Sequence, residues 1–114
     1  MGTLYLRLLD GTTLVDGDAQ DLTAAQDLAG YRELEIVVRV TQAGEGDAPR
    51  LIVEHSPGNE SATYLAFSDP VEVDLTATSI TWFHQGAFTR WVRWRVDGTL
   101  STSAVVTVEI VGKG

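Results

Sequence analysis

The tryptophan and arginine side chains of residues 89–97 have the types and spacing best suited to binding a partner. The segment reads TRWVRWRVD, and successive side chains of a β-strand point to opposite faces of a sheet. Trp94 therefore lies with two valines on the face expected in the core, and Trp91, Arg93 and Arg95 lie on the other. On that face Trp91 has three possible roles: a half-buried ring shielded by the arginine side chains, an anchor in a protein interface, or a platform for a sugar ring.

The aspartates of the segment Asp16–Asp27 form a second group whose chemistry deserves a test, because calcium takes several oxygens from one flexible loop. Asp16, Asp18 and Asp21 lie close together in the motif DGDAQD. That motif lacks the later glycine and the closing glutamate of an EF-hand loop. We expect a solvated acidic loop or a short helix, with cation binding by this loop as the open alternative and no metal site assigned.

Residue types used in catalysis are present but are not arranged in a known motif. His55 and His84 have no second histidine at metal-ligand spacing, and the chain contains no cysteine. No serine lies in a GxSxG elbow, and the glycines at 44 and 46 precede no predicted helix that could bind a phosphate. We expect both histidines to be structural and the protein to be no enzyme, with no catalytic residue and no cofactor.

The elements that must position these side chains are predicted to be β-strands. Valine, isoleucine and threonine number 13, 4 and 13 of the 114 residues, and such branched side chains favour pleated sheet. Segment 32–41 is the clearest strand, because its apolar and polar residues alternate. The inward set is Leu34, Ile36, Val38 and Val40, and the outward set is Glu33, Glu35, Arg39 and Thr41.

Turn residues divide the chain into eight or nine short strands without a long helical pattern. This pattern predicts an all-β fold, an antiparallel two-sheet β-sandwich of jelly-roll type with about eight strands, in a single domain over residues 1–114. The last strand is two-sided, because two valines share a face with Thr107 and Glu109 while the other face is wholly apolar, and it should pair centrally or lie at a subunit contact. The expected breaks between strands are at Asp10-Gly11, at residues 43–49, at Asp69-Pro70, and at Asp97-Gly98, a tight hairpin.

Composition and charge make several classes of partner improbable. The chain has 8 basic and 16 acidic residues, a net charge of −8, which disfavours broad contact with nucleic acid. The absence of cysteine excludes a disulfide scaffold. The first residues alternate and include Arg7, and the longest uncharged stretch, Leu75–Thr89, is 15 residues long. We therefore expect no signal peptide, no membrane span and no nucleic-acid partner.

Four phrases of the sequence resemble small β-sandwich proteins encoded among the structural genes of tailed phages and prophages. The similarity spans residues 27–112. The late-strand phrase TRWVRWRV is also similar to the corresponding strand of discoidin-like, galactose-binding sandwiches. The phrases that carry the phage resemblance are DLAGYRELEIVVRV, LIVEHSP, FTRWVRWRVDG and VVTVEIVGKG.

The phage resemblance implies a non-enzymatic structural protein of a phage-like particle, a capsid decoration, cementing or auxiliary virion protein. Such a protein would be assembled in the host cytoplasm, located in the virion and bound to capsid or other virion proteins, as a trimer or dimer. The alternative is a carbohydrate-binding module that uses Trp91 or Trp82 as its platform. The resemblance assigns the subunit or capsid contacts to five residues, Trp91, Arg93, Arg95, Tyr31 and Phe88.

Overall fold

The protein is an all-β sandwich, described by a computed structural model over residues 2–114. Two short 3-10 helices, η1 (Leu22–Ala24) and η2 (Ser61–Thr63), interrupt the loops. The predicted fold class is confirmed. The eight strands are β1 (Thr3–Leu14), β2 (Gln26–Asp27), β3 (Glu33–Gln42), β4 (Glu45–Ser56), β5 (Leu65–Asp74), β6 (Ser79–Gln85), β7 (Trp91–Thr102) and β8 (Ala104–Lys113).

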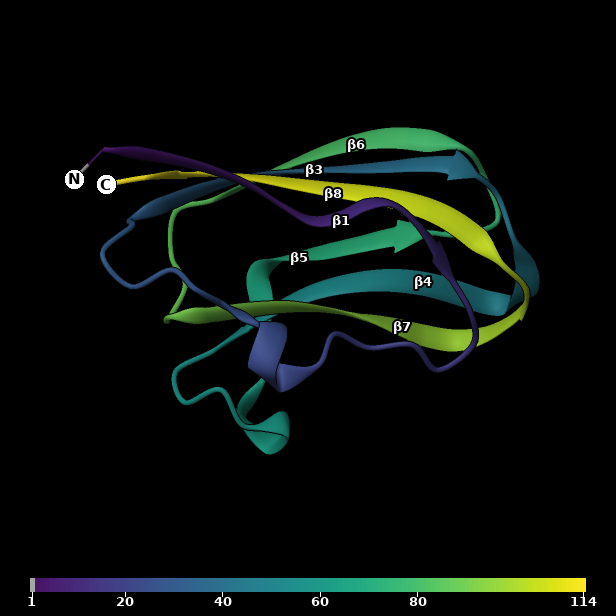
Figure 1. Ribbon diagram of the computed structural model, residues 1–114, viewed down its shortest axis with the longest axis horizontal. Helices are drawn as coiled ribbons and strands as arrows, with labels where there is room; N and C mark the ends of the chain where they lie inside the picture. Colours follow the sequence, from purple (N-terminus) through teal and green to yellow (C-terminus); the bar gives the residue numbers. More distant parts are fainter. Residues whose placement is uncertain (1) are drawn as a thin grey trace.

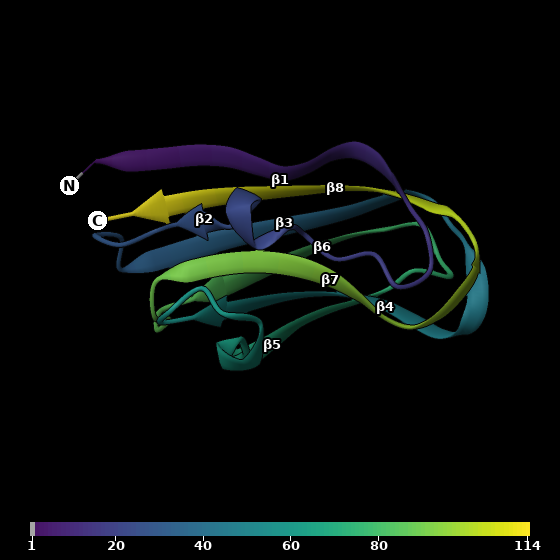
Figure 2. The same cartoon turned by 60° about the horizontal axis from the view of Figure 1, so that its bottom comes forward.

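The strands form two antiparallel four-stranded sheets, with orders β1-β8-β3-β6 and β2-β7-β4-β5. Within these sheets the first strand pairs with the last, the second with the seventh, the third with the sixth and the fourth with the fifth. This nesting is that of one long hairpin rolled into two layers, as Figures 1 and 2 show. The topology is therefore that of a jelly roll, as the sequence predicts.

The core lies between the two sheets and is built from the inward side chains of alternating strands. All four residues predicted to face inward on β3 are at most 2% exposed. β8 pairs with both β1 and β3, so this two-sided strand is central in its sheet, which confirms that expectation. Its inward residues, Ala104, Val106, Val108 and Ile110, are fully buried.

Several expected turns are irregularities within continuous strands. β7 runs straight through Asp97-Gly98, so the hairpin predicted there is wrong. Gly98 has a φ of 73°, and a Cβ atom on it would collide with the carbonyl oxygen of Ala48 on β4, where the register shifts. A glycine with positive φ serves either a tight turn or a bulge, and only the neighbouring strand distinguishes the two.

The other three breaks have similar explanations. Asp10-Gly11 lies in a bulged part of β1, where the Gly11 amide donates to Thr107 Oγ1 at 2.8 Å. Asp69-Pro70 lies within β5, an edge strand in which proline breaks no ladder hydrogen bond on its outer side. Most of segment 43–49, predicted as a loop, belongs to β4. None of the helices in the described part of the chain is long and apolar enough to cross a membrane.

Candidate functional site

The outer face of the β2-β7-β4-β5 sheet holds a nearly buried ion pair that uses two of the predicted site residues. Arg93 Nε donates to Glu54 Oε1 at 3.0 Å, and Arg95 Nε donates to Glu54 Oε2 at 3.2 Å. Glu54 is 4% exposed, and the Arg93 side chain is 11% exposed. Arg95 also donates to Asp97, at 3.2 Å. Both arginines thus have partners within the chain.

Loop residues cover this part of the sheet, which we call the covered face. The Tyr64 ring is buried and lies 4.3 Å from the guanidinium carbon of Arg93, and its hydroxyl donates to Asn59 Oδ1 at 2.6 Å. Burial raises the pKa of this hydroxyl. Asn59 Nδ2 in turn donates to the Leu22 carbonyl at 3.0 Å, which ties the loop around η2 to the loop around η1.

The three remaining predicted contact residues, Trp91, Phe88 and Tyr31, are partly buried, and only Trp91 lies beside the arginines. Trp91 is on the covered face, with the guanidinium of Arg90 5.2 Å above its ring. Phe88 packs against the core from the loop between β6 and β7. Tyr31 also packs against the core, with its ring directly over Gly112 of β8. The structure therefore brings Trp91, Arg93 and Arg95 together and leaves Tyr31 and Phe88 outside that group.

The aspartates of the acidic segment are used separately in local structure. Asp16 accepts from the Leu100 amide at 2.9 Å, Asp18 from the Val15 amide at 2.8 Å, and Asp21 caps η1 through the Thr23 amide at 2.9 Å. No group of three metal-ligating side chains occurs within residues 2–114. These carboxylates thus order the loop itself, as turn and cap residues do.

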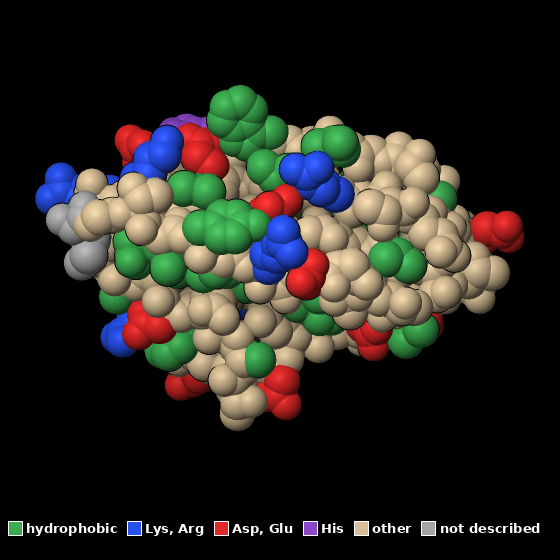
Figure 3. Space-filling model, turned by 45° about the horizontal axis from the view of Figure 1, so that its top comes forward, with side chains coloured by type: hydrophobic (Ala, Val, Ile, Leu, Met, Phe, Trp, Pro, Cys, Tyr) green, Lys and Arg blue, Asp and Glu red, His purple; other side chains and the backbone are tan. Residues whose placement is uncertain are grey.

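The β1-β8-β3-β6 sheet has an outer face that no loop within residues 2–114 covers, and we call it the open face. Figure 3 shows it, with hydrophobic side chains projecting among arginines and carboxylates. Its largest apolar side chains are far from buried: Trp82 and Ile80 are both 70% exposed, and Tyr5 is 54% exposed. The open face comprises Tyr5, Arg7 and Asp10 of β1, Thr107, Glu109, Val111 and Lys113 of β8, Glu33, Glu35, Val37 and Arg39 of β3, and Ile80, Trp82 and His84 of β6.

Glu109 is the centre of a hydrogen-bond network across three strands of the open face. It accepts from the Tyr5 hydroxyl on Oε2 at 2.6 Å and from Arg39 Nε on Oε1 at 2.9 Å. Arg7 Nε donates to the same Tyr5 hydroxyl at 2.9 Å. The bond from Tyr5 lowers the pKa of Glu109, and the bond from Arg39 adds to this. Both oxygens of the carboxylate are therefore occupied.

Glu35 is the centre of a second hydrogen-bond network, near the β6 edge of the open face. Trp82 Nε1 donates to Glu35 Oε2 at 2.6 Å, which fixes the exposed indole, and His84 Nδ1 lies 2.7 Å from Oε1. Lys113 Nζ lies 3.6 Å from Oε1. Burial alone raises the pKa of Glu35, but the hydrogen bonds from His84 and Trp82 outweigh it, so the pKa is lowered. The apolar ring is thus held in place by charged neighbours.

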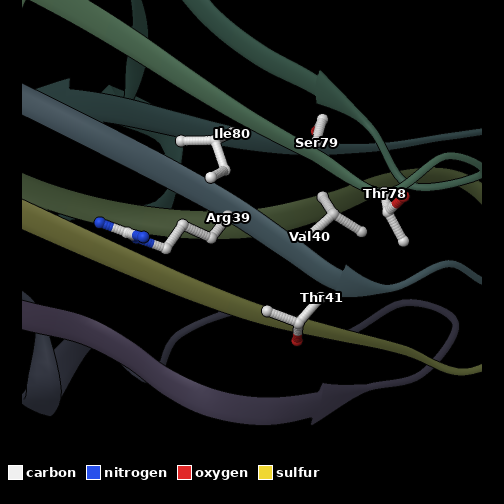
Figure 4. A pocket seen from close by; sticks show the side chains of 6 residues that line it. All are labelled: Arg39, Val40, Thr41, Thr78, Ser79 and Ile80. Carbon is white, nitrogen blue, oxygen red and sulfur yellow. The ribbon is translucent and has the colours of Figure 1, made fainter.

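A shallow depression continues the open face where the end of β3 lies beside the start of β6. Figure 4 shows its lining, to which β3 contributes Arg39 and β6 contributes Ser79 and Ile80. The Ser79 hydroxyl is buried and has no hydrogen-bond partner in the described part of the chain. Two threonines, Thr41 and Thr78, also line the depression, so polar side chains outnumber Val40 and Ile80 there.

Sequence reasoning predicted part of the open face, but it named Trp82 only as an alternative sugar platform and did not assign the exposed aromatic group to this face. The alternation in segment 32–41 correctly placed Glu33, Glu35 and Arg39 outward. In segment 79–85 each face carries one large aromatic ring and at least one polar side chain, so alternation alone cannot tell whether Trp82 or Phe83 is buried. The outward position of Glu35 is a usable signal, because Trp82 lies diagonally across from it in the register.

No protein-family model matches the chain, and no curated protein matches it in sequence. Among solved structures, the chain is similar to one of the disulfide-linked pili that Bacillus endospore appendages form. The two share 12% identity with a TM-score of 0.44, over 98% of this chain and 88% of that chain. This chain contains no cysteine.

Proposed function

We propose that this protein is a non-enzymatic structural protein of a phage-like particle, a decoration or cementing protein whose open face makes the contact through which it assembles there. The observation that carries the proposal is the exposure of Trp82, Ile80 and Tyr5 on one continuous sheet face. Tyr5 lies on β1 and the other two on β6, at opposite edges of this face, with Glu109 and Arg39 between them. Exposed aromatic side chains among paired polar groups are typical of protein–protein contact sites. The protein would be assembled in the host cytoplasm and located in the virion.

The polar groups of the open face favour a protein partner over a sugar. The four carboxylate oxygens of Glu35 and Glu109 already accept hydrogen bonds from side chains of the same face. A sugar is recognised through free donors and acceptors beside an aromatic ring, whereas a protein interface needs its polar groups satisfied before water is removed. The open face meets the second requirement.

The fold by itself does not choose between these partners. Jelly rolls occur in viral shell proteins and in lectins, so the argument for a particle rests on the open face and on the resemblance of the sequence phrases. The sequence-based contact set, Trp91, Arg93, Arg95, Tyr31 and Phe88, remains a second proposal for the same role. It differs in requiring the covered face.

The test is co-purification with particles from the organism that encodes the protein. Particles would be isolated on a density gradient and probed with an antibody to this chain. In a second experiment, purified wild type, Trp82→Ala and Trp91→Ala would each be added to particles from which this protein has been removed. We expect the wild type and Trp91→Ala to co-sediment with particles and Trp82→Ala to bind at least about tenfold more weakly. A chain that never co-sediments overturns the proposal, and loss only with Trp91→Ala supports the covered face.

Glycan-array binding provides the arm for the carbohydrate alternative. Sugar binding would be established if the wild type binds a specific glycan and Trp82→Ala, with an unchanged circular dichroism spectrum, does not. If particle binding is also absent, this result overturns the structural function. We expect no glycan to bind, since the hydrogen-bonding atoms beside the indole are already occupied.

A further inference from the structure

We infer that the partner of the open face is a second copy of this chain, bound face to face about a two-fold axis. The inference rests on the proposed function, because it names the partner of the same site. A two-fold contact requires a surface that complements itself, with both signs of charge and a shared apolar anchor. The open face has both.

The distribution of charge is the first argument for a second copy. Two molecules that each carry −8 repel each other, so self-association requires a surface from which this excess is absent. The open face has three basic and four acidic side chains, a net charge of −1, which leaves −7 for the rest of the chain. The charged side chains of the open face are Arg7, Arg39, Lys113, Asp10, Glu33, Glu35 and Glu109.

The covered face is nearly as balanced, but its apolar and arginine groups are already in use. Arg93 and Arg95 are paired with Glu54, and the Tyr64 ring covers Arg93. The largest acidic excess lies instead in loops and at strand ends, for example at Asp16, Asp18 and Asp21. Contact through those parts would bring carboxylates of two copies together.

The size of the open face agrees with what a specific dimer needs. Four strands of about ten residues span roughly 19 by 33 Å, or about 600 Å² of flat sheet. Projecting side chains such as Trp82 and Ile80 increase the accessible area above that value. Specific interfaces bury about 800 Å² on each partner, so the open face is large enough for one whole contact.

The ion pairs of the open face lower the cost of burying it. Glu109 is bonded to Tyr5 and Arg39, and Glu35 to Trp82 and His84, before any partner arrives. A carboxylate whose oxygens keep their donors avoids the penalty for an unpaired buried charge. Trp82, on the edge strand β6, then serves as an apolar anchor, because its indole is 70% exposed.

Sedimentation velocity of the purified full chain over a concentration series tests the inference. We expect a monomer–dimer equilibrium in which Trp82→Ala raises the dissociation constant by at least about tenfold. Ile80→Glu, which puts an extra charge on the same face, should have a comparable effect. The matched control is Trp91→Ala, which should leave the dissociation constant within about twofold. Circular dichroism spectra would show that each variant is folded.

The outcomes separate this inference from the proposed function. A wild type that stays monomeric at every concentration overturns the inference, as does a dimer that survives both Trp82→Ala and Ile80→Glu. A monomer that still co-sediments with particles refutes the dimer and supports the function. A dimer that Trp82→Ala and Ile80→Glu both disrupt, with no co-sedimentation, supports the dimer and refutes the function.

Discussion

The outer faces of the two sheets use similar side chains in opposite ways. On the covered face, the buried Glu54 binds Arg93, which lies beneath the Tyr64 ring, and the partly exposed Arg95. On the open face, Glu109 binds Tyr5 and Arg39 in contact with solvent. Each face thus pairs a carboxylate with arginine across neighbouring strands and adds a tyrosine to the group.

The difference between the faces lies in what covers them. The loops around η1 and η2 are tied together by the Asn59–Leu22 hydrogen bond, and the second of them carries Tyr64 over the sheet. A buried ion pair with one partner removed is costly, whereas an exposed one contributes little. We therefore expect the covered face to matter for stability and the open face for binding, and matched substitutions on the two faces test this.

The largest expected contrast is between Glu54→Gln and Glu35→Gln. Glu54→Gln leaves the nearly buried guanidinium of Arg93 without its charge partner and removes one of the two partners of Arg95, so it should lower the free energy of unfolding by about 3 kcal/mol. The same change at Glu35, on the open face, should cost about 1 kcal/mol or less. Urea denaturation of both variants measures this. Equal losses would contradict the distinction between the faces.

The tryptophans give the next contrast. Trp94 is partly buried and packs against the core, so Trp94→Ala should destabilise the protein by about 2 kcal/mol. Trp82 is largely exposed, so Trp82→Ala should change stability by no more than about 0.5 kcal/mol. Thermal unfolding followed by circular dichroism provides the comparison. A strongly destabilised Trp82→Ala protein would mean that its indole is part of the fold.

The tyrosine hydroxyls form a smaller pair. Tyr64→Phe removes a buried donor to Asn59 and should cost about 1 kcal/mol. Tyr5→Phe removes a donor to Glu109 where water can replace it, and should cost about 0.5 kcal/mol or less. Both losses follow from denaturant midpoints at neutral pH. The idea fails if the Tyr5 variant is the less stable of the two.

The smallest expected effect is the change in stability at acidic pH that comes from the exposed Asp27–Arg90 ion pair, which lies beside the covered face. Arg90 donates to Asp27 at 2.8 and 2.6 Å, and these bonds lower the pKa of Asp27 to about 2. The pair therefore stabilises the fold above the unfolded pKa of about 3.9, and the contribution is lost as the pH falls through about 2.

Melting temperatures of the wild type and Asp27→Asn across this acid range test the effect. The difference between the two proteins should be greatest near neutral pH and should shrink as the pH falls from about 4 towards 2. A difference that stays constant over that range would show that Asp27 acts without its charge.

The sequence by itself determined the fold class, the inward face of β3 and the central place of β8. The alternation at β3 and the two-sided pattern of β8 follow from local residue order, and they correctly predicted burial in the first case and a central position in the second. The same local signals failed at Asp97-Gly98, where glycine allows a bulge because β4 passes close to β7. The residues around a glycine in its own segment do not reveal which strand packs against it across the sheet.

Only the tertiary structure decided which aromatic and arginine group is available to a partner. TRWVRWRVD has the composition of an interface, yet Glu54 lies 39 residues before Arg93 and pairs with it across the sheet. Trp82 lies in an ambiguous strand, and it is exposed because no loop crosses the sheet that holds it. The availability of a side chain depends on contacts between distant segments, and these arise only when the sheets pack and the loops settle on one of them.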